Sequence, residues 1–272
     1  MVSDQDGPAL QFDAIVQEFR PPSGNGSRRI LDGISFDVHP GQFTAVVGPS
    51  GCGKSTLLNL AAGLLFPTAG VVRQKGAAIR SVSRTIGFVP QQAQLLPWKT
   101  LRQNVELPLA LRQVPAEERA SRVSEIVAAV GLEGFEEHYP HQLSGGMQKR
   151  VAIARTLVYR PEIVLMDEPF GSLDAQTRMV MQDDLQALWR RQRTTIVFVT
   201  HDLTEAVVLA DNVVLLSRQP TRLKANVAID LERPRNVFQP FHTPGFGELY
   251  DHVWAIFQSE VTRPTSTRGM RP

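Results

Sequence analysis

The chain has 272 residues, of which 42% are hydrophobic and 21% are charged, as in an ordinary globular protein with one large or two smaller domains. Its formal net charge of +2 is too small to indicate binding to nucleic acid or to an anionic membrane surface, and its single cysteine excludes an internal disulfide. No apolar run approaches the roughly 18 residues that a membrane-spanning helix needs. If the protein works at a membrane, another chain must supply the spans.

The first part of the chain is predicted to be rich in β-strands, with one helix at residues 55–62. A loop rich in Pro, Gly and Ser is expected at residues 21–29. Alternating or uniformly apolar residues predict strands at four places, residues 11–19, 34–38, 44–47 and 85–89.

A glycine-rich loop joins the strand at 44–47 to the helix. It reads Gly48-Pro49-Ser50-Gly51-Cys52-Gly53-Lys54-Ser55-Thr56 and fits the phosphate-binding pattern G-x-x-x-x-G-K-[ST]. The glycines let backbone N–H groups turn toward a phosphate, and the helix start adds positive charge. Lys54 can reach the β- and γ-phosphates, and the Ser55 hydroxyl can ligate Mg²⁺. The loop therefore predicts a site for a nucleoside triphosphate.

From about residue 95 the pattern becomes mainly helical and then alternates again. Helices are predicted at residues 100–130, 144–158, 175–191 and 204–210, and strands at residues 162–166, 195–199 and 213–216. This alternation indicates an α/β sheet with a helical insertion between about residues 92 and 155. After Ser217 the pattern weakens, and the last ten residues are predicted to be disordered.

A second glycine-rich helix start follows the insertion. Leu143-Ser144-Gly145-Gly146-Met147-Gln148 opens the helix at 144–158, and Ser144 is suited to be its N-cap. Each glycine costs about 1 kcal/mol relative to alanine inside a helix, so capping alone does not account for the pair. Close approach of a phosphate to their N–H groups would account for both. A monomer has no evident use for two phosphate-binding helix starts.

Two adjacent carboxylates, Asp167 and Glu168, follow a buried strand. Adjacent carboxylates repel each other unless a cation or a proton lies between them, so the pair suits a metal site better than an ordinary acidic turn. His201 lies just after the strand at 195–199, at the carboxyl end of a strand, where α/β sheets bind ligands. A lone histidine is usually structural, and its position is what makes this one a candidate.

These motifs and their order resemble those of ATP-binding cassette (ABC) ATPases over residues 10–220. Leu143 to Gln148 is similar to the signature motif of that family. The resemblance implies an α/β fold: a P-loop NTPase (RecA-like) core with an antiparallel β subdomain and an inserted α-helical subdomain. The expected divisions are residues 1–91 for the first part of the core, 92–155 for the helical subdomain, 156–217 for the second part of the core, and 218–272 for a C-terminal extension.

The resemblance also implies roles for single residues. Two cassettes meet head to tail in that family, and each ATP lies between the phosphate loop of one copy and the signature of the other. Glu168 matches the catalytic glutamate, His201 the switch histidine, and Gln91 the glutamine that senses Mg²⁺ and the attacking water. Mg²⁺ ligands are expected to be Ser55, Gln91 and Asp167. The implied nucleotide contacts are residues 48–56 together with Ser144, Gly145, Gly146, Gln148, Asp174 and the aromatic Phe19.

The expected partners follow from the same resemblance. They are a second copy or a paralogous cassette, integral membrane permease subunits and, indirectly, a solute-binding protein, at the cytoplasmic face of the membrane. Residues 91–98, 100–105 and 232–235 are similar to cassettes of the nitrate/sulfonate/taurine importer group. Alternatives are a cassette of another membrane complex, such as lipoprotein release, or an ABC ATPase acting on nucleic acid. We expect no nucleic acid, because the basic run at 190–193 is typical of a solvated helix end.

Overall fold

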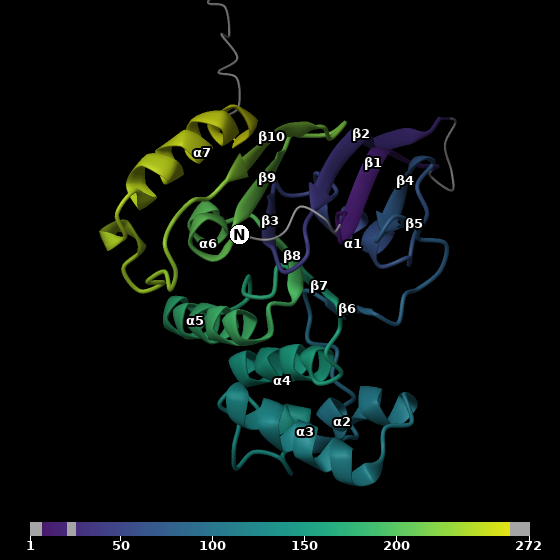
Figure 1. The fold of residues 1–272 in the computed structure, drawn as a ribbon, viewed down its shortest axis with the longest axis vertical. Coiled ribbons are helices and arrows are strands. Elements are labelled where there is room, and N and C mark those ends of the chain that lie inside the picture. Colours follow the sequence, from purple (N-terminus) through teal and green to yellow (C-terminus); the bar gives the residue numbers. More distant parts are fainter. Residues whose placement is uncertain (1–6, 21–25, 262–272) are drawn as a thin grey trace, which may run out of the picture.

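The computed structural model describes residues 7–20 and 26–261. Two β-sheets lie side by side, and helices surround the larger one (Figure 1). The smaller sheet is antiparallel, with the strand order β2-β1-β4-β5. Its strands are β1 (Leu10–Phe19), β2 (Arg28–Val38), β4 (Ala69–Gln74) and β5 (Ala77–Ala78).

The larger sheet has the strand order β10-β9-β3-β8-β7-β6, and only β10 runs antiparallel to its neighbour. β3, β7, β8 and β9 are buried along their whole length, as parallel strands covered on both faces must be. The strands are β3 (Phe43–Val47), β6 (Ile86–Val89), β7 (Ile163–Asp167), β8 (Thr195–Thr200), β9 (Asn212–Leu216) and β10 (Leu223–Ala228).

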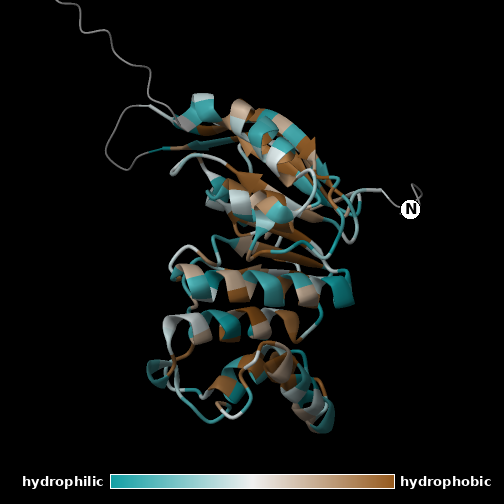
Figure 2. Cartoon of the chain, turned by 90° about the vertical axis from the view of Figure 1, so that its left-hand side faces the viewer, coloured by the Kyte–Doolittle hydropathy of each residue, from teal (hydrophilic) through white to brown (hydrophobic). Residues whose placement is uncertain are grey.

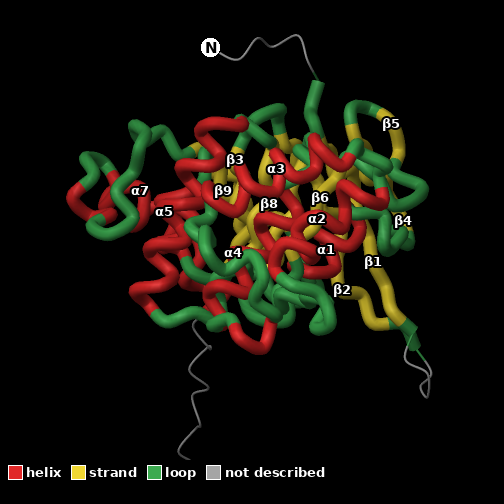
Figure 3. Tube along the Cα trace, turned by 90° about the horizontal axis from the view of Figure 1, so that it is seen from below, coloured by secondary structure: helices red, strands yellow, loops and turns green. Residues whose placement is uncertain are grey.

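The helices divide between the sheets and a separate lobe. The lobe contains α2, α3 and α4 and extends from the sheet at the bottom of Figure 1. In the view from below, α2, α3 and α4 cover the middle of the molecule, with the antiparallel sheet on one side of the view and α5 and α7 on the other (Figure 3). The helices are α1 (Lys54–Ala61), α2 (Leu101–Leu111), α3 (Ala116–Ala129), α4 (Gly145–Leu157), α5 (Ala175–Gln192), α6 (Leu203–Leu209) and α7 (Phe246–Val261), with short 3₁₀ helices at Pro140–Gln142 and Pro240–His242.

The buried side chains form two clusters on the two faces of the larger sheet. One cluster joins α1 to the antiparallel sheet and contains Phe12, Leu57 and Val46. The other continues from β3 through Phe198 into the helical lobe at Val105. Hydrophobic residues accordingly follow the strands and the inward faces of the helices (Figure 2). Among the described helices, none is long and apolar enough to cross a membrane.

The fold class expected from the sequence is confirmed, and several local expectations are corrected. The predicted loop at 21–29 ends earlier, because β2 begins at Arg28. The next residue of β2, Arg29, forms an ion pair with Glu18 on the neighbouring strand β1. The predicted helix at 100–130 is two helices, because the chain turns between α2 and Pro115, the N-cap of α3. The expected division at residue 155 stays a prediction and lies within α4. The predicted disorder of the last ten residues lies outside the described residues.

The weakly patterned segment after Ser217 is ordered in the described part, which the sequence analysis missed. It forms β10 and α7, joined by residues 229–245. Arg235, only 2% exposed, donates to the Val207 and Ala210 carbonyls at the end of α6. Arg233 pairs with Asp211 at 2.7 Å and lies 4.3 Å from the centre of the Trp189 ring. Residues 232–235, similar to one importer group, thus tie α5 and α6 together.

Candidate active site

The carboxyl ends of the parallel strands bring the predicted catalytic segments together. Val47 lies opposite Thr200 and Asp167 lies opposite Val199, so the loops that follow these strands meet at one edge of the sheet. A pocket of about 470 Å³ opens there. Its lining comes from the smaller sheet, the phosphate loop and the strand ends, and consists of Phe19, Ile30, Ser50, Gly51, Gly53, Lys54, Ser55, Thr56, Gln91, Asp167, Glu168 and Gln219.

The phosphate loop has a shape that only glycines fit. Gly51 and Gly53 have φ angles of +75° and +108°, in the left-handed region that other residues rarely adopt. A Cβ on Gly53 would lie 2.8 Å from Cγ2 of Ile30, and one on Gly48 would lie 2.7 Å from Sγ of Cys52. The loop is therefore packed from beneath, and the Cys52 thiol belongs to that packing instead of the pocket lining.

Lys54, the first residue of α1, is 5% exposed and lies against its own loop. Its ammonium donates to the Gly48 carbonyl at 2.9 Å and to the Pro49 carbonyl at 3.3 Å. It also lies 3.6 Å from Oε1 of Glu168. Carbonyl and carboxylate oxygens thus surround the lysine at the point where phosphate oxygens would replace them.

Glu168 is the centre of the polar contacts in the pocket. Its φ of +42° is uncommon for a residue other than glycine, and such strain is found most often at functional sites. Oε2 of Glu168 lies 3.3 Å from Nδ1 of His201 and accepts from Nε2 of Gln91 at 3.4 Å. The three predicted catalytic residues are therefore in direct contact in one chain.

Asp167 ends β7 and is 9% exposed. Burial raises the pKa of Asp167, and a hydrogen bond from the Ser55 hydroxyl acts in the opposite direction. A desolvated carboxylate beside a hydroxyl supplies the hard oxygen ligands that Mg²⁺ prefers. The described residues contain no group of three or more His, Cys, Asp or Glu that could hold a metal alone. A metal here would depend on phosphate oxygens and water to complete its ligands.

The second glycine-rich helix start does not line this pocket. Ser144 caps α4 and accepts from the Met147 N–H at 3.3 Å. A Cβ on Gly146 would lie 2.7 Å from Cγ2 of Thr177, whereas a Cβ on Gly145 would meet nothing within 4 Å. Close packing against Thr177 of α5 is a second reason for a glycine at position 146, and the approach of a phosphate to both glycines stays a prediction. Gly145 faces open space.

Two further predicted nucleotide contacts have other partners within the chain. The Gln148 amide donates to the Pro140 carbonyl at 2.8 Å and to the Leu143 carbonyl at 3.2 Å. The Asp174 carboxylate accepts from the Thr177 N–H at 3.0 Å as the N-cap of α5, and this bond lowers the pKa of Asp174. Neither residue lines the pocket of its own chain.

Sequence reasoning missed the residues that support the loop from outside the motifs. Gln219 lines the pocket and donates to the Gly51 carbonyl at 2.5 Å, and the Thr221 hydroxyl donates to the Cys52 carbonyl. Ile30 fills the space beside Gly53. No motif marks these three residues, which come from segments distant in sequence. Phe19, which was predicted, lines the pocket and is 43% exposed.

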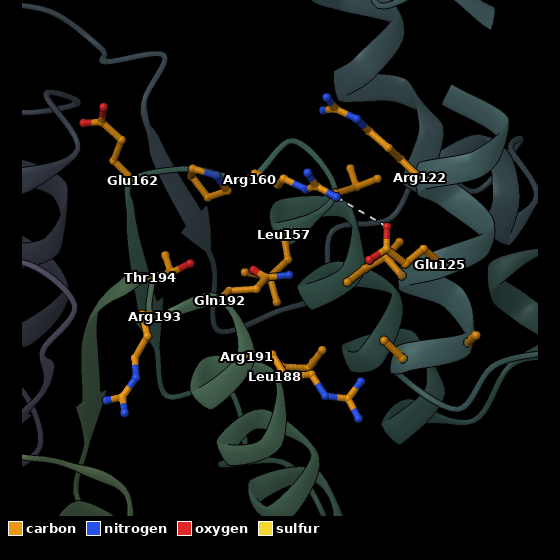
Figure 4. A pocket seen from close by; sticks show the side chains of 15 residues that line it. Arg122, Glu125, Leu157, Arg160, Glu162, Leu188, Arg191, Gln192, Arg193 and Thr194 are labelled. Atoms are coloured by element: carbon orange, nitrogen blue, oxygen red, sulfur yellow. Dashed lines mark hydrogen bonds and ion pairs between the residues drawn. The ribbon is translucent and has the colours of Figure 1, made fainter. Parts of the chain in front are cut away.

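A larger hollow of about 840 Å³ lies between α3, the end of α5 and the segments that enter β7 and β8 (Figure 4). It is rich in arginine, but Arg160 pairs with Glu125 across it at 3.4 Å. Arg122 pairs with Glu118 at 2.5 Å, and the guanidinium of Arg193 lies 5.1 Å from the centre of the Trp189 ring. The hollow shares no lining residue with the nucleotide pocket.

Comparison with known proteins agrees with this geometry. A family model described as ABC transporter matches residues 31–171. An uncharacterized ABC transporter ATP-binding protein of Methanocaldococcus jannaschii is 51% identical over 78% of this chain and 80% of that protein. The aliphatic sulfonates import ATP-binding protein of Bacillus subtilis (strain 168) is 40% identical over 92% of this chain and 93% of that protein.

A solved structure gives the same result for the fold. The chain is similar to a dimeric ATP-binding cassette in a post-hydrolysis state bound to ADP and Pi, with a TM-score of 0.72 and 32% identity over 81% of this chain and 98% of that one. The phosphate loop, the acidic strand end and the helical lobe lie within the residues that the family model matches. The chain belongs to the ABC transporter family, as an ATP-binding subunit that hydrolyses ATP.

Proposed function

We propose that two copies of this chain hydrolyse ATP as a head-to-tail dimer that powers an importer. One observation carries the proposal: the start of α4 has open space at Gly145 and contributes nothing to the pocket of its own chain. A helix start with free N–H groups suits the γ-phosphate of a nucleotide held by another copy. The dimeric state of the similar cassette supports this pairing.

The pocket residues would have different roles in binding Mg²⁺ and in hydrolysing ATP. Ser55, Asp167 and Gln91 would hold Mg²⁺, whose charge neutralises that of the β- and γ-phosphates. Glu168 polarises the attacking water, and His201 orients Glu168 and contacts the γ-phosphate. Lys54 exchanges the Gly48 and Pro49 carbonyls for phosphate oxygens.

Other residues bind the nucleotide or face the second copy. The backbone N–H groups of the phosphate loop hold the α- and β-phosphates, and Phe19 stacks on the adenine from the edge of the pocket. The signature that covers the nucleotide of the other copy contains Ser144, Gly145, Gly146 and Gln148. Asp174 lies at that interface.

The segment after Gln91 has the features of a contact surface for a membrane protein. Leu95 packs against the core, whereas Trp98, just before the start of α2, is 70% exposed. Asn104, fully buried, donates to the carbonyls of Leu96 and Lys99 and fixes this loop. An ordered loop that presents a tryptophan suits a helix of a permease subunit at the cytoplasmic face of the membrane.

The solute class is proposed from similarity. The sulfonate importer name of one relative favours a small anionic solute such as a sulfonate, nitrate or taurine, delivered by a solute-binding protein. Another membrane complex is the alternative. The residues that contact a solute would lie in other chains of the complex.

Purification with the neighbouring gene products tests the proposal. We expect a permease to co-purify, and Trp98→Ala to weaken its binding by about 1–3 kcal/mol while the ATPase activity of the isolated chain is kept. Co-purification with nucleic acid, or an unchanged affinity of Trp98→Ala for the permease, would contradict it. Uptake of a sulfonate and of nitrate into vesicles holding the whole complex then distinguishes the solutes.

A further inference from the structure

A buried lysine lies on the inward side of α4. Lys149 is 4% exposed, and its ammonium donates to the backbone carbonyl of Gln91. In residues 7–20 and 26–261 no carboxylate forms a close ion pair with it, and Asp167 acts on its charge only from beyond 4.0 Å, whereas its neighbour Arg150 pairs with Asp184 at 3.0 Å. Burying a charge without a close ion-pair partner lowers stability, so fold stability alone does not explain a lysine here.

A second cationic side chain of α4 binds the backbone just after Gln91. Arg155 donates to the Gln94 carbonyl at 3.0 Å and to the Ala93 carbonyl at 3.1 Å. Gln94 has a φ of +44°, in the left-handed region, so the loop is held in a conformation that it would not readily adopt alone. Lys149 and Arg155 of α4 thus donate charge-assisted hydrogen bonds to three backbone carbonyls of residues 91–94. Such bonds are among the stronger hydrogen bonds in proteins.

The same helix connects two parts of the ATPase chemistry. Its N-terminal end carries the open Gly145, and its inward side holds the backbone of Gln91. The side chain of Gln91 donates to Glu168 at 3.4 Å. A displacement of α4 therefore moves Gln91 relative to Glu168, because an α-helix transmits motion as a rigid element.

We propose that Lys149 and Arg155 are positioning residues that tie Gln91 to α4, so that Gln91 reaches its working position when the start of α4 binds the nucleotide of a second copy. The tie itself follows from contacts within one chain. Its coupling to the second copy rests on the proposed dimer.

The variant Lys149→Met tests the tie, because it keeps the length and apolar stem of lysine and removes the donor and the charge. We expect kcat for ATP hydrolysis to fall roughly 10-fold to 100-fold, as displacement of a catalytic group by about 1 Å can do. The Kd for ATP and the melting temperature should stay close to wild type. Lys75→Met, at an exposed lysine paired with Glu162, is the matched control and should keep wild-type kcat.

A double-mutant cycle with Gln91→Ala shows whether Lys149 acts through Gln91. In the Gln91→Ala background, Lys149→Met should lower kcat by less than about 2-fold, because nothing remains to be positioned. Unchanged kcat in Lys149→Met, or equal fold-losses in both backgrounds, would overturn the proposal. Arg155→Met should repeat the pattern, so that it provides the test if Lys149→Met does not fold.

The coupling to a second copy has its own measurement. If the wild-type protein hydrolyses ATP without forming dimers, the proposed pairing fails. The tie between α4 and Gln91 would still be judged by the double-mutant cycle, since those contacts lie within one chain.

Discussion

The two glycine-rich helix starts of this chain, at α1 and at α4, look alike in sequence and differ in structure. The phosphate-binding conformation at the start of α1 is complete within one chain. Gly53 has a left-handed backbone and packs against Ile30, and Lys54 is buried. At the start of α4, Gly145 has a helical backbone and faces open space. The first start is a preformed cradle. The second has the features of a surface that a nucleotide on another copy completes.

Changes at the two starts should therefore separate binding from turnover. A change in the cradle should affect nucleotide binding by a single chain. A change at α4, or at the residues that activate water, should affect turnover and leave that binding intact.

Glu168→Gln should lower kcat roughly 10²-fold to 10⁴-fold, because the amide cannot accept a proton from the attacking water. The variant removes the charge that faces Lys54 but leaves the phosphate loop in place, so the Kd for ATP should stay within about 2-fold of wild type, since no nucleotide contact of the loop is lost. Steady-state hydrolysis and equilibrium ATP titration measure the two quantities. Turnover near the wild-type rate would remove Glu168 from its proposed role.

Gly145→Asp should lower kcat by roughly 10²-fold to 10³-fold, because a carboxylate would face the γ-phosphate held by the second copy. Stability should not fall, since an acidic residue in the first turn of a helix is favourable and space is open there. Melting temperature and ATP affinity of the single chain are the controls. A wild-type kcat would show that this helix start does not meet a nucleotide.

Gly53→Ala should act on the cradle itself. Alanine in the left-handed region costs about 1–2 kcal/mol, and its Cβ would also press on Ile30. We expect ATP to bind about 10-fold more weakly, which corresponds to about 1.4 kcal/mol, together with a lower melting temperature. Calorimetric titration of the monomeric protein measures the loss. Unchanged affinity would mean that the loop does not depend on this backbone conformation.

The smallest expected effect is on the rate at which the Cys52 thiol is alkylated. Burial raises the pKa of this thiol, and only the thiolate reacts, so alkylation at pH 7 should be slower than that of free cysteine and should quicken as the pH rises. Bound ATP should slow it further by holding the loop closed over the thiol. Reaction as fast as that of free cysteine would contradict the packing of Cys52 beneath the loop.

The cradle could be predicted from the sequence because its parts are adjacent in the chain. Strand, glycines and lysine lie within residues 44–56, and the Asp167–Glu168 pair ends a strand of plainly apolar residues. Local spacing carries the information needed for such segments.

The supports of the cradle could not be predicted in this way. The hydrogen bond from Gln219 to Gly51 joins residues 168 positions apart, and no periodicity marks either end. The same holds for Arg235, whose guanidinium binds the carbonyls at the end of α6. Only the structure distinguishes Gly146, where a Cβ would press on Thr177, from Gly145, where a Cβ would meet open space.

The central claim is that ATP hydrolysis needs two chains, and light scattering tests it directly. The Glu168→Gln variant is measured with and without ATP, since slow turnover keeps the nucleotide in place. The account predicts twice the mass of one chain in ATP and a single-chain mass without it. Adding Gly145→Asp to the same variant should abolish the doubling. A mass that ATP does not change, or doubling that survives Gly145→Asp, would contradict the account.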